Sequence, residues 1–170
     1  MKNRFLPRLM IEDIEAVVTP LPGLTYLTKL RQIVGGAKLS VDVIQYQWNF
    51  YPYEKTLPLQ QFNEDIMNQI RAGRKYRVIL NIADRGTKIA RINNNARKNL
   101  VSAGAKVKFG SRFVITHAKL FIIDDRFVFL GSHNLSKFAV AQNDEVSILI
   151  NNVTIAMEYK RYFDLLWSRK

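Results

Sequence analysis

The sequence predicts an α/β fold in which a mixed β-sheet is sandwiched between helices. Short runs of apolar and β-branched residues alternate along the chain with longer segments whose apolar residues recur at helical spacing. This alternation is typical of layered α/β proteins. The chain has 170 residues, of which 48% are hydrophobic and 24% charged. Because these values fit one globular domain, we expect residues 1–170 to form a single domain.

The first half of the chain contains three expected strands and two expected helices. The runs that suit strands are 14–20, 38–48 and 76–83, and the segments that suit helices are 24–37 and 59–73. Both helices end at glycine, which favours helix termination. The loop 49–58 separates the second strand from the second helix. Aromatic residues at 46–53 are interpreted as core packing or a dimer contact, with nucleobase stacking as the alternative.

The second half alternates in the same way. Residues 86–104 suit a helix, with one apolar stripe made of Ile89, Ile92, Ala96, Leu100 and Ala103. The expected strands that follow are 105–110, 115–123, 127–134 and 143–150. A last helix is expected over 153–170, with a buried face made of Ile155, Tyr159, Tyr162, Phe163 and Leu166.

Positive charge is concentrated in the middle of the chain. The net charge is +12, and residues 71–112 hold twelve Lys and Arg residues but a single acid, Asp84. A block of one sign repels itself on folding unless it faces a polyanion, most commonly nucleic acid. An anionic membrane surface attracts it by the same force. We assign contacts with the phosphate backbone of nucleic acid to Arg85, Lys88, Arg91, Lys98, Lys106, Lys108 and Arg112.

The absence of cysteine excludes disulfides, thiolate nucleophiles and thiolate zinc sites, and it suits a reducing compartment. Near the N-terminus, apolar residues occur only in short pieces that Pro7 and Arg8 interrupt. A signal peptide needs a continuous apolar core, and no later segment is apolar enough to span a membrane. We therefore expect a cytoplasmic protein without stable membrane association.

Both histidines of the chain lie in residues 116–134, where two short apolar runs flank the tripeptide Asp-Asp-Arg. Because side chains alternate along an extended strand, His117 and Lys119 share one face, and Ser132 and Asn134 also share one face. Antiparallel pairing of the two runs therefore brings an imidazole, an ammonium, a hydroxyl and an amide to one patch.

The details of this patch depend on the turn within residues 124–126. A two-residue turn in either of two positions places His117 opposite Ser132 or Asn134, whereas a three-residue turn directs His133 toward the patch. With either two-residue turn, His133 is interpreted as a polar loop residue, with contact to substrate as the alternative.

These four groups suit a phosphodiester. An ammonium, a hydroxyl and an amide can hold its non-bridging oxygens and neutralise the charge that grows at phosphorus in the transition state. A histidine can attack the phosphorus or move the proton to the leaving oxygen. Because this chemistry needs no carboxylate cluster, we expect no metal and no cofactor.

The same residues resemble a known sequence motif. The pattern His117-x-Lys119-x4-Asp124, followed by Gly131-Ser132-x-Asn134, is similar to the HKD motif of the phospholipase D superfamily. The resemblance implies a phospholipase D-like fold with one HKD motif per chain. Glu145 lies where nuclease members of that superfamily carry a glutamate. We expect its carboxylate to hydrogen-bond a catalytic imidazole, in its own chain or in a partner, and to fix the tautomer.

The resemblance also implies a role for each motif residue. His117 is the expected nucleophile, which forms a phosphohistidine intermediate, and Lys119 and Asn134 are expected to hold the phosphate. Ser132 is expected to support them. Asp124 belongs to the motif but is expected to be structural, because its parity along the strand is opposite to that of His117.

Larger members of the superfamily carry two such motifs per chain and use two histidines, one to attack and one to protonate the leaving group. This chain carries one motif, since His133 is too close to Ser132 on the same strand to reach the far side of a bound phosphate. We therefore expect a homodimer in which two copies of the motif meet across a twofold axis. Such a dimer resembles the small single-motif nucleases of the superfamily.

The expected activity is that of a metal-independent endonuclease that cleaves DNA, or RNA, at the phosphodiester. Two alternatives stay open. A phospholipid phosphodiesterase or phosphatidyltransferase shares the motif, although the small size and single motif argue against it. A nucleic-acid-binding module with a vestigial site is the other alternative, and the completeness of the motif argues against that.

Overall fold

The computed structural model describes residues 13–169. The stretch 1–12, in which no signal peptide is expected, lies outside the described residues, as does Lys170 at the end of the last expected helix. Within the described part, no helix is both long and apolar enough to cross a lipid bilayer.

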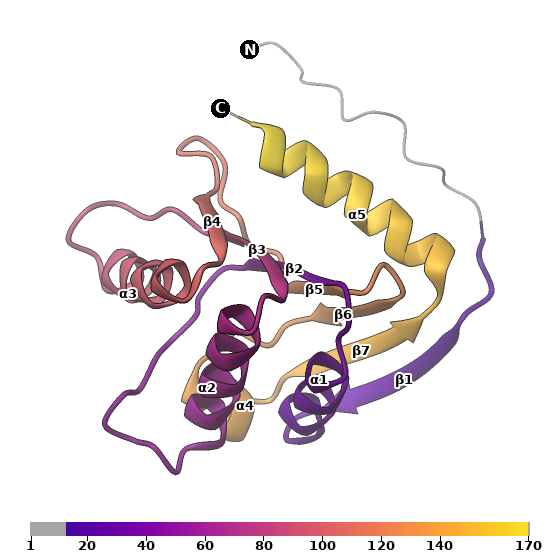
Figure 1. The fold of residues 1–170 in the computed structure, drawn as a ribbon, viewed down its shortest axis with the longest axis horizontal. Helices are drawn as coiled ribbons and strands as arrows, with labels where there is room; N and C mark the ends of the chain where they lie inside the picture. The colour runs from indigo at the N-terminus through magenta and orange to yellow at the C-terminus, as the bar shows by residue number, and fades with distance from the viewer. Residues whose placement is uncertain (1–12, 170) are drawn as a thin grey trace.

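A seven-stranded mixed sheet forms the centre of the fold (Figure 1). Its strands are β1 (Val17–Pro22), β2 (Ser40–Gln45), β3 (Lys75–Leu80), β4 (Lys106–Phe109), β5 (Leu120–Ile123), β6 (Phe127–Gly131) and β7 (Val146–Asn151). Their order across the sheet is β1-β7-β6-β5-β2-β3-β4. The pairs β2·β3 and β3·β4 are parallel, and the other four pairs are antiparallel. The expected mixed sheet is confirmed.

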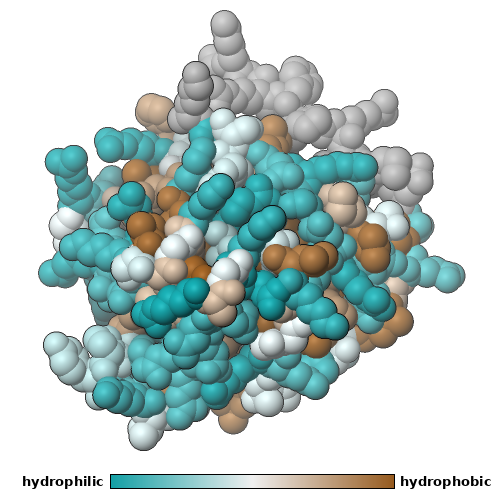
Figure 2. Space-filling view, in the orientation of Figure 1, coloured by the Kyte–Doolittle hydropathy of each residue, from teal (hydrophilic) through white to brown (hydrophobic). Residues whose placement is uncertain are grey.

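Helices cover both faces of this sheet, as expected. They are α1 (Thr25–Gly35), α2 (Pro58–Arg71), α3 (Lys88–Ala103), α4 (Lys137–Ala141) and α5 (Val153–Ser168). The larger hydrophobic core joins α1, α2 and α3 to one face, with Leu30, Phe62 and Leu100 among its buried residues. A smaller core joins α5 to the other face around Phe163 (Figure 1). In the same orientation, hydrophilic side chains cover most of the visible surface (Figure 2).

The predicted elements are present with shifted ends, and one helix was not predicted. Helix α4 has only five residues, too few for apolar periodicity to mark it, and begins where the Ser136 hydroxyl accepts from the Ala139 backbone N–H. In α3, the buried residues include Asn93, a polar residue that lies at the helical spacing of the predicted apolar stripe but was not expected to be buried. Its amide is buried because it bonds backbone groups, as described below.

The strand directions bring several chain segments to one edge of the sheet. Because β2, β3 and β4 are parallel, their carboxyl ends share an edge, which we call the carboxyl edge. Strand β5 runs antiparallel to β2 and therefore begins there. By the same reasoning β6 ends there and β7 begins there. The residues after β2, β3, β4 and β6, and those before β5 and β7, therefore meet along the carboxyl edge.

The turn between β5 and β6 lies at the opposite edge and has three residues. Ile123 pairs with Phe127, so both predicted two-residue turns are wrong. The three-residue register does not direct His133 to the predicted patch, because the pairing stops at Leu120 and Leu130. Asp124, in this turn, adopts a φ of +52°, which aspartate tolerates better than most residues.

Asp124 joins this turn to the start of β2. Its carboxylate accepts hydrogen bonds from the backbone N–H groups of Lys38 at 2.7 Å, Leu39 at 2.7 Å and Ser40 at 3.0 Å. Partial burial raises the pKa of the Asp124 carboxyl, but these bonds outweigh it, so the pKa lies below its ordinary value. The motif aspartate therefore holds the sheet together at the edge away from His117.

We predict that Asp124→Asn lowers the free energy of unfolding by about 1–2 kcal/mol at neutral pH, because charge-assisted hydrogen bonds are lost. Since folding lowers this pKa, the stabilisation is complete above about pH 4, the ordinary aspartate pKa, and is lost as the pH falls further. Urea titrations at several pH values should therefore converge for variant and wild type in acid.

Asp125→Asn is the matched control. Asp125 lies in the same turn at the same φ of +52°, but its carboxylate is 40% exposed and 3.8 Å from Lys160. This variant should unfold like the wild type. Equal losses in both variants would mean that the turn, and not the three bonds, carries the stability.

Candidate active site

His117 and Lys119 form a close pair just before β5, at the carboxyl edge. The Lys119 ammonium donates to the backbone carbonyl of His117 at 2.6 Å. It also lies 3.1 Å from Nδ1 and 3.3 Å from Nε2 of the His117 imidazole. The lysine is only 8% exposed, whereas the imidazole is exposed. A held positive charge therefore lies beside an accessible nitrogen nucleophile.

Tyr46, which follows β2, forms a wall beside this pair. Its ring centroid lies 4.9 Å from that of the His117 imidazole, and the Lys119 ammonium lies 5.2 Å from the same tyrosine ring. Burial lowers the pKa of Lys119, and the negative charge of Glu145 offsets part of that change. An aromatic face attracts a cation, so the ring also favours the charged form. Tyr46 therefore belongs to the candidate site and is not simply core packing.

The Gly131-Ser132 pair lies close against β7. A Cβ at Gly131 would overlap the Ser147 side chain and the backbone of Val146, so only glycine fits. The Ser132 hydroxyl donates to the Val146 carbonyl at 3.2 Å and accepts from the Val146 N–H at 3.0 Å. These bonds make Ser132 a clamp between the end of β6 and the start of β7.

Two amide side chains at the carboxyl edge have polar atoms without partners among the described residues. They are both side-chain atoms of Gln45 and the Oδ1 of Asn134. Gln45 is fully buried, and the pairing of Ile44 with Leu120 places the next residue, Gln45, opposite Lys119 if the register continues. Asn134 adjoins the segment after β2, because the Leu135 N–H donates to the Gln47 carbonyl. Unpaired buried polar groups are costly and are characteristic of sites that complete their bonding with a ligand.

Glu145 does not hold the His117 imidazole of its own chain, so of the two predicted arrangements the contact with an imidazole of a partner stays a prediction. Its carboxylate accepts from the Asn143 side chain at 3.1 Å, and its backbone carbonyl accepts from the Gly23 N–H. Among the hydrogen bonds of residues 13–169, none joins Glu145 to His117. Its influence within the chain is electrostatic, on Lys119 and His133.

His133 is a core residue, and its interpretation as a polar loop residue is wrong. It is fully buried and stacks on Tyr26, with centroids 4.2 Å apart. Its Nε2 lies 3.1 Å from the Gly23 carbonyl, which can only accept, so Nε2 carries the hydrogen and Nδ1 accepts from the Ser147 hydroxyl at 2.8 Å. Burial lowers the pKa of His133, against the opposing effects of the Gly23 carbonyl and Glu145. The neutral His133 ring therefore has a structural role in the core.

A pair of asparagines, which sequence reasoning missed, holds the loops of the carboxyl edge together. Asn93 of α3 donates to the backbone carbonyls of Tyr46 at 2.8 Å and Asn81 at 2.9 Å. The Asn81 side chain in turn accepts from the Thr116 N–H at 2.9 Å, directly before His117. The available signal was the helical spacing of Asn93 with Ala96, Leu100 and Ala103, which places it, unlike Asn94 and Asn95, on the apolar stripe.

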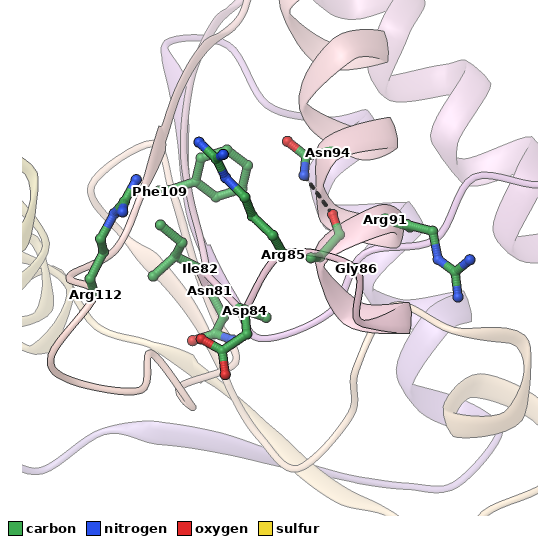
Figure 3. A pocket seen from close by; sticks show the side chains of 11 residues that line it. Asn81, Ile82, Asp84, Arg85, Gly86, Arg91, Asn94, Phe109 and Arg112 are labelled. Atoms are coloured by element: carbon green, nitrogen blue, oxygen red, sulfur yellow. Dashed lines mark hydrogen bonds between the residues drawn. The ribbon is translucent and has the colours of Figure 1, made fainter.

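The predicted nucleic-acid-binding residues do not form one patch. Lys88 and Lys98 are exposed on α3. Lys106 lines a cavity at the opposite edge of the sheet, and Lys108 donates to the Trp167 carbonyl of α5. The remaining three line a cavity of about 490 Å³ at the carboxyl edge, which we call the arginine pocket (Figure 3). Its lining includes Arg85, Arg91, Arg112, Phe109, Asn81 and Asp84.

A family model described as "Cardiolipin synthase, PLD-like domain" matches residues 30–167. This range includes the motif residues from His117 to Glu145 and nearly all of the sheet. The chain belongs to the phospholipase D superfamily. No curated protein sequence matches it significantly.

Solved structures share the fold over most of this chain. Nuc from Salmonella typhimurium, a phospholipase D family member, is 18% identical, with a TM-score of 0.74 over 90% of this chain and 95% of its own. NucT from Helicobacter pylori is 22% identical, with a TM-score of 0.69 over 90% and 96%. Phosphatidylserine synthase from Haemophilus influenzae Rd KW20 is 15% identical, with a TM-score of 0.63 over 86% and 38%. The predicted phospholipase D-like fold is confirmed.

We predict that His133 contributes to the stability of the fold and that His117 does not. His133→Ala should lower the free energy of unfolding by roughly 2–4 kcal/mol, because it empties a stacked core position and leaves two polar groups unpaired. His117→Ala should change it by less than about 0.5 kcal/mol, because the imidazole is exposed. Urea unfolding of both variants tests this, and a large loss in His117→Ala would show that its ring is a packing element.

Proposed function

We propose that the protein is a metal-independent endonuclease that cleaves nucleic acid, DNA in preference to RNA, through a covalent phosphohistidine. The observation that carries the proposal is the exposed His117 imidazole with the buried Lys119 ammonium beside it. The net positive charge of the chain supports a polyanionic substrate.

In the first step, an imidazole nitrogen of His117 attacks phosphorus, an N–P bond forms, and the bond from phosphorus to the leaving oxygen breaks. Lys119 and the Asn134 amide stabilise the negative charge on the non-bridging oxygens. The leaving oxygen needs a proton. In the second step, water loses a proton to a base and attacks the same phosphorus, which breaks the N–P bond and restores His117.

A second histidine is needed to donate and accept these protons. His133 cannot do so, because it is buried and both of its ring nitrogens are engaged. We therefore propose a homodimer in which His117 of the partner subunit protonates the leaving oxygen and then activates water. The side chains of Phe113, Val114 and Ile115, which precede Thr116 and His117, are 96%, 58% and 71% exposed and supply apolar surface for such a contact.

The same exposed apolar residues favour a second candidate function, cleavage or transfer of phospholipid head groups. An apolar loop beside the nucleophile and next to Arg112 suits an anionic lipid surface. A nucleic-acid-binding module with a vestigial site is the third candidate. A missing motif residue would favour this candidate, and the motif is complete.

We predict that the protein nicks plasmid DNA in excess EDTA and that His117→Ala abolishes turnover while binding is retained. The reason is that histidine, and not a metal-bound water, supplies the nucleophile. Gel analysis of nicking, with fluorescence anisotropy for binding, measures both. A divalent-metal requirement would contradict the mechanism. Release of head groups from anionic vesicles without plasmid nicking would favour the phospholipid-cleaving function. Tight binding without any turnover would favour the nucleic-acid-binding module with a vestigial site.

We predict that activity in mixtures of wild type and His117→Ala follows the square of the wild-type fraction after the subunits are exchanged. A reaction centre that needs two His117 residues forms only in wild-type homodimers. The mixture is compared with one made with Lys38→Ala, which changes an exposed side chain at the edge of the sheet away from His117 and should retain nearly full activity. A linear dependence, together with a monomer mass in solution, would rule out a shared centre.

A further inference from the structure

We propose that the arginine pocket binds one unpaired nucleotide next to the scissile phosphate. This proposal rests on the proposed nuclease function. It adds that the substrate is single-stranded at this position.

The charge in the arginine pocket is available to a ligand. Among the ion pairs of residues 13–169, none involves Arg85, Arg91 or Arg112. The lining contains one acid, Asp84, and it is not paired with any of the three. Guanidinium groups bind phosphate oxygens through two parallel hydrogen bonds, so this lining selects a phosphorylated ligand.

The cavity at the opposite edge shows the contrast. It has a similar volume, about 510 Å³, and also contains several basic residues. There, however, the buried Asp42 carboxylate pairs with Arg77 at 2.5 Å and with Lys160 at 3.1 Å. Arg77 also pairs with Asp164 of α5 at 2.8 Å. These pairs fasten α5 to the sheet, so the charges of that cavity are structural.

The walls of the arginine pocket suit a nucleobase as well as a phosphate. Phe109 ends β4 and is only partly buried, and Ile82, Ala83 and Ala90 add apolar surface. In Figure 3 the side chains of Arg85 and Arg112 lie on the same side as the Phe109 ring, whereas Arg91 extends to the other side of Gly86. Bases stack on aromatic rings and on guanidinium planes. The cavity volume falls in the ~300–1,000 Å³ range of small-ligand sites.

The position of the arginine pocket connects it to the nucleophile. Asn81 lines the cavity and accepts a hydrogen bond from the N–H of Thr116, the residue directly before His117. A strand whose phosphate lies at His117 can therefore place a neighbouring nucleotide in the pocket. In a duplex that base must first be unpaired and unstacked, which costs free energy. The pocket therefore favours single strands.

The test uses the full-length protein with one oligonucleotide in single-stranded form, in duplex form and with a single abasic site. The single strand should be cleaved at least about tenfold faster than the duplex. A factor of this size corresponds to the free energy of stacking one base. Cuts at one fixed offset from the abasic site should weaken about tenfold, and cuts elsewhere should not. Arg85→Ala/Arg112→Ala should cleave all forms alike, whereas Lys38→Ala, which removes an exposed charge outside the pocket, should keep both preferences.

Binding gives a readout that does not depend on cleavage. His117→Ala is titrated with short single strands that carry 2-aminopurine at one position at a time. Fluorescence should change at one position, and the change should disappear in His117→Ala/Arg85→Ala/Arg112→Ala. Phe109→Leu, which keeps an apolar side chain, should weaken it too, with thermal melting as the check on folding.

Cleavage without any dependence on strandedness or on the abasic position would contradict nucleotide binding in the arginine pocket. It would not contradict the proposed nuclease function. A position-specific fluorescence change without any cleavage would support the pocket and contradict the proposed function. Loss of phospholipid cleavage in Arg85→Ala/Arg112→Ala, with no nucleotide response, would overturn the nucleotide assignment.

Discussion

The antiparallel pairing of β5 with β2, in the middle of the sheet, is the contact on which the candidate site depends. Strands β2, β3 and β4 are parallel and end at the carboxyl edge. If β5 were parallel to them, His117 and Lys119 would lie at the opposite edge, far from Tyr46 and Asn81. Reversing the chain at β5 brings the start of one strand beside the ends of three others. Asp124 fixes the reversal from the other end through its three backbone hydrogen bonds.

A buried ammonium is the main electrostatic cost of this arrangement. Burying a charge without compensation is unfavourable, and Lys119 is almost fully buried. The compensation comes from the His117 carbonyl, the Tyr46 ring and the nearby charge of Glu145. None of these is a tight ion pair within the described chain, so the ammonium keeps its capacity to bind an anion. A phosphate would complete its coordination.

The sequence predicted the layering, the strands and the motif because each has a local signature: apolar periodicity, or the fixed spacing between His117 and Asn134. The burial of Asn93 was missed although its spacing places it on the apolar stripe of α3, because the carbonyls that bond its amide come from two distant segments. The burial of His133 was missed for a related reason. Its partners Tyr26, Gly23 and Ser147 come from other elements. The basic block is divided because its residues lie on different parts of the fold. Lys106 begins β4 at the edge away from His117, Lys108 bonds the Trp167 carbonyl of α5, and the three arginines of the pocket lie at the carboxyl edge.

The arginine pocket adds a consequence for a shared reaction centre. In the proposed homodimer, the twofold axis that joins the two His117 residues also relates two copies of the pocket. A nucleic-acid strand has a direction and cannot match that symmetry. It would place a nucleotide on one side of the scissile phosphate in one pocket, whereas it would pass the other pocket with the opposite polarity and could not bind there in the same way. Turning the strand around exchanges the two pockets at no energetic difference, so either histidine can be the nucleophile. The direction in which the strand binds would then determine which of the two His117 residues attacks.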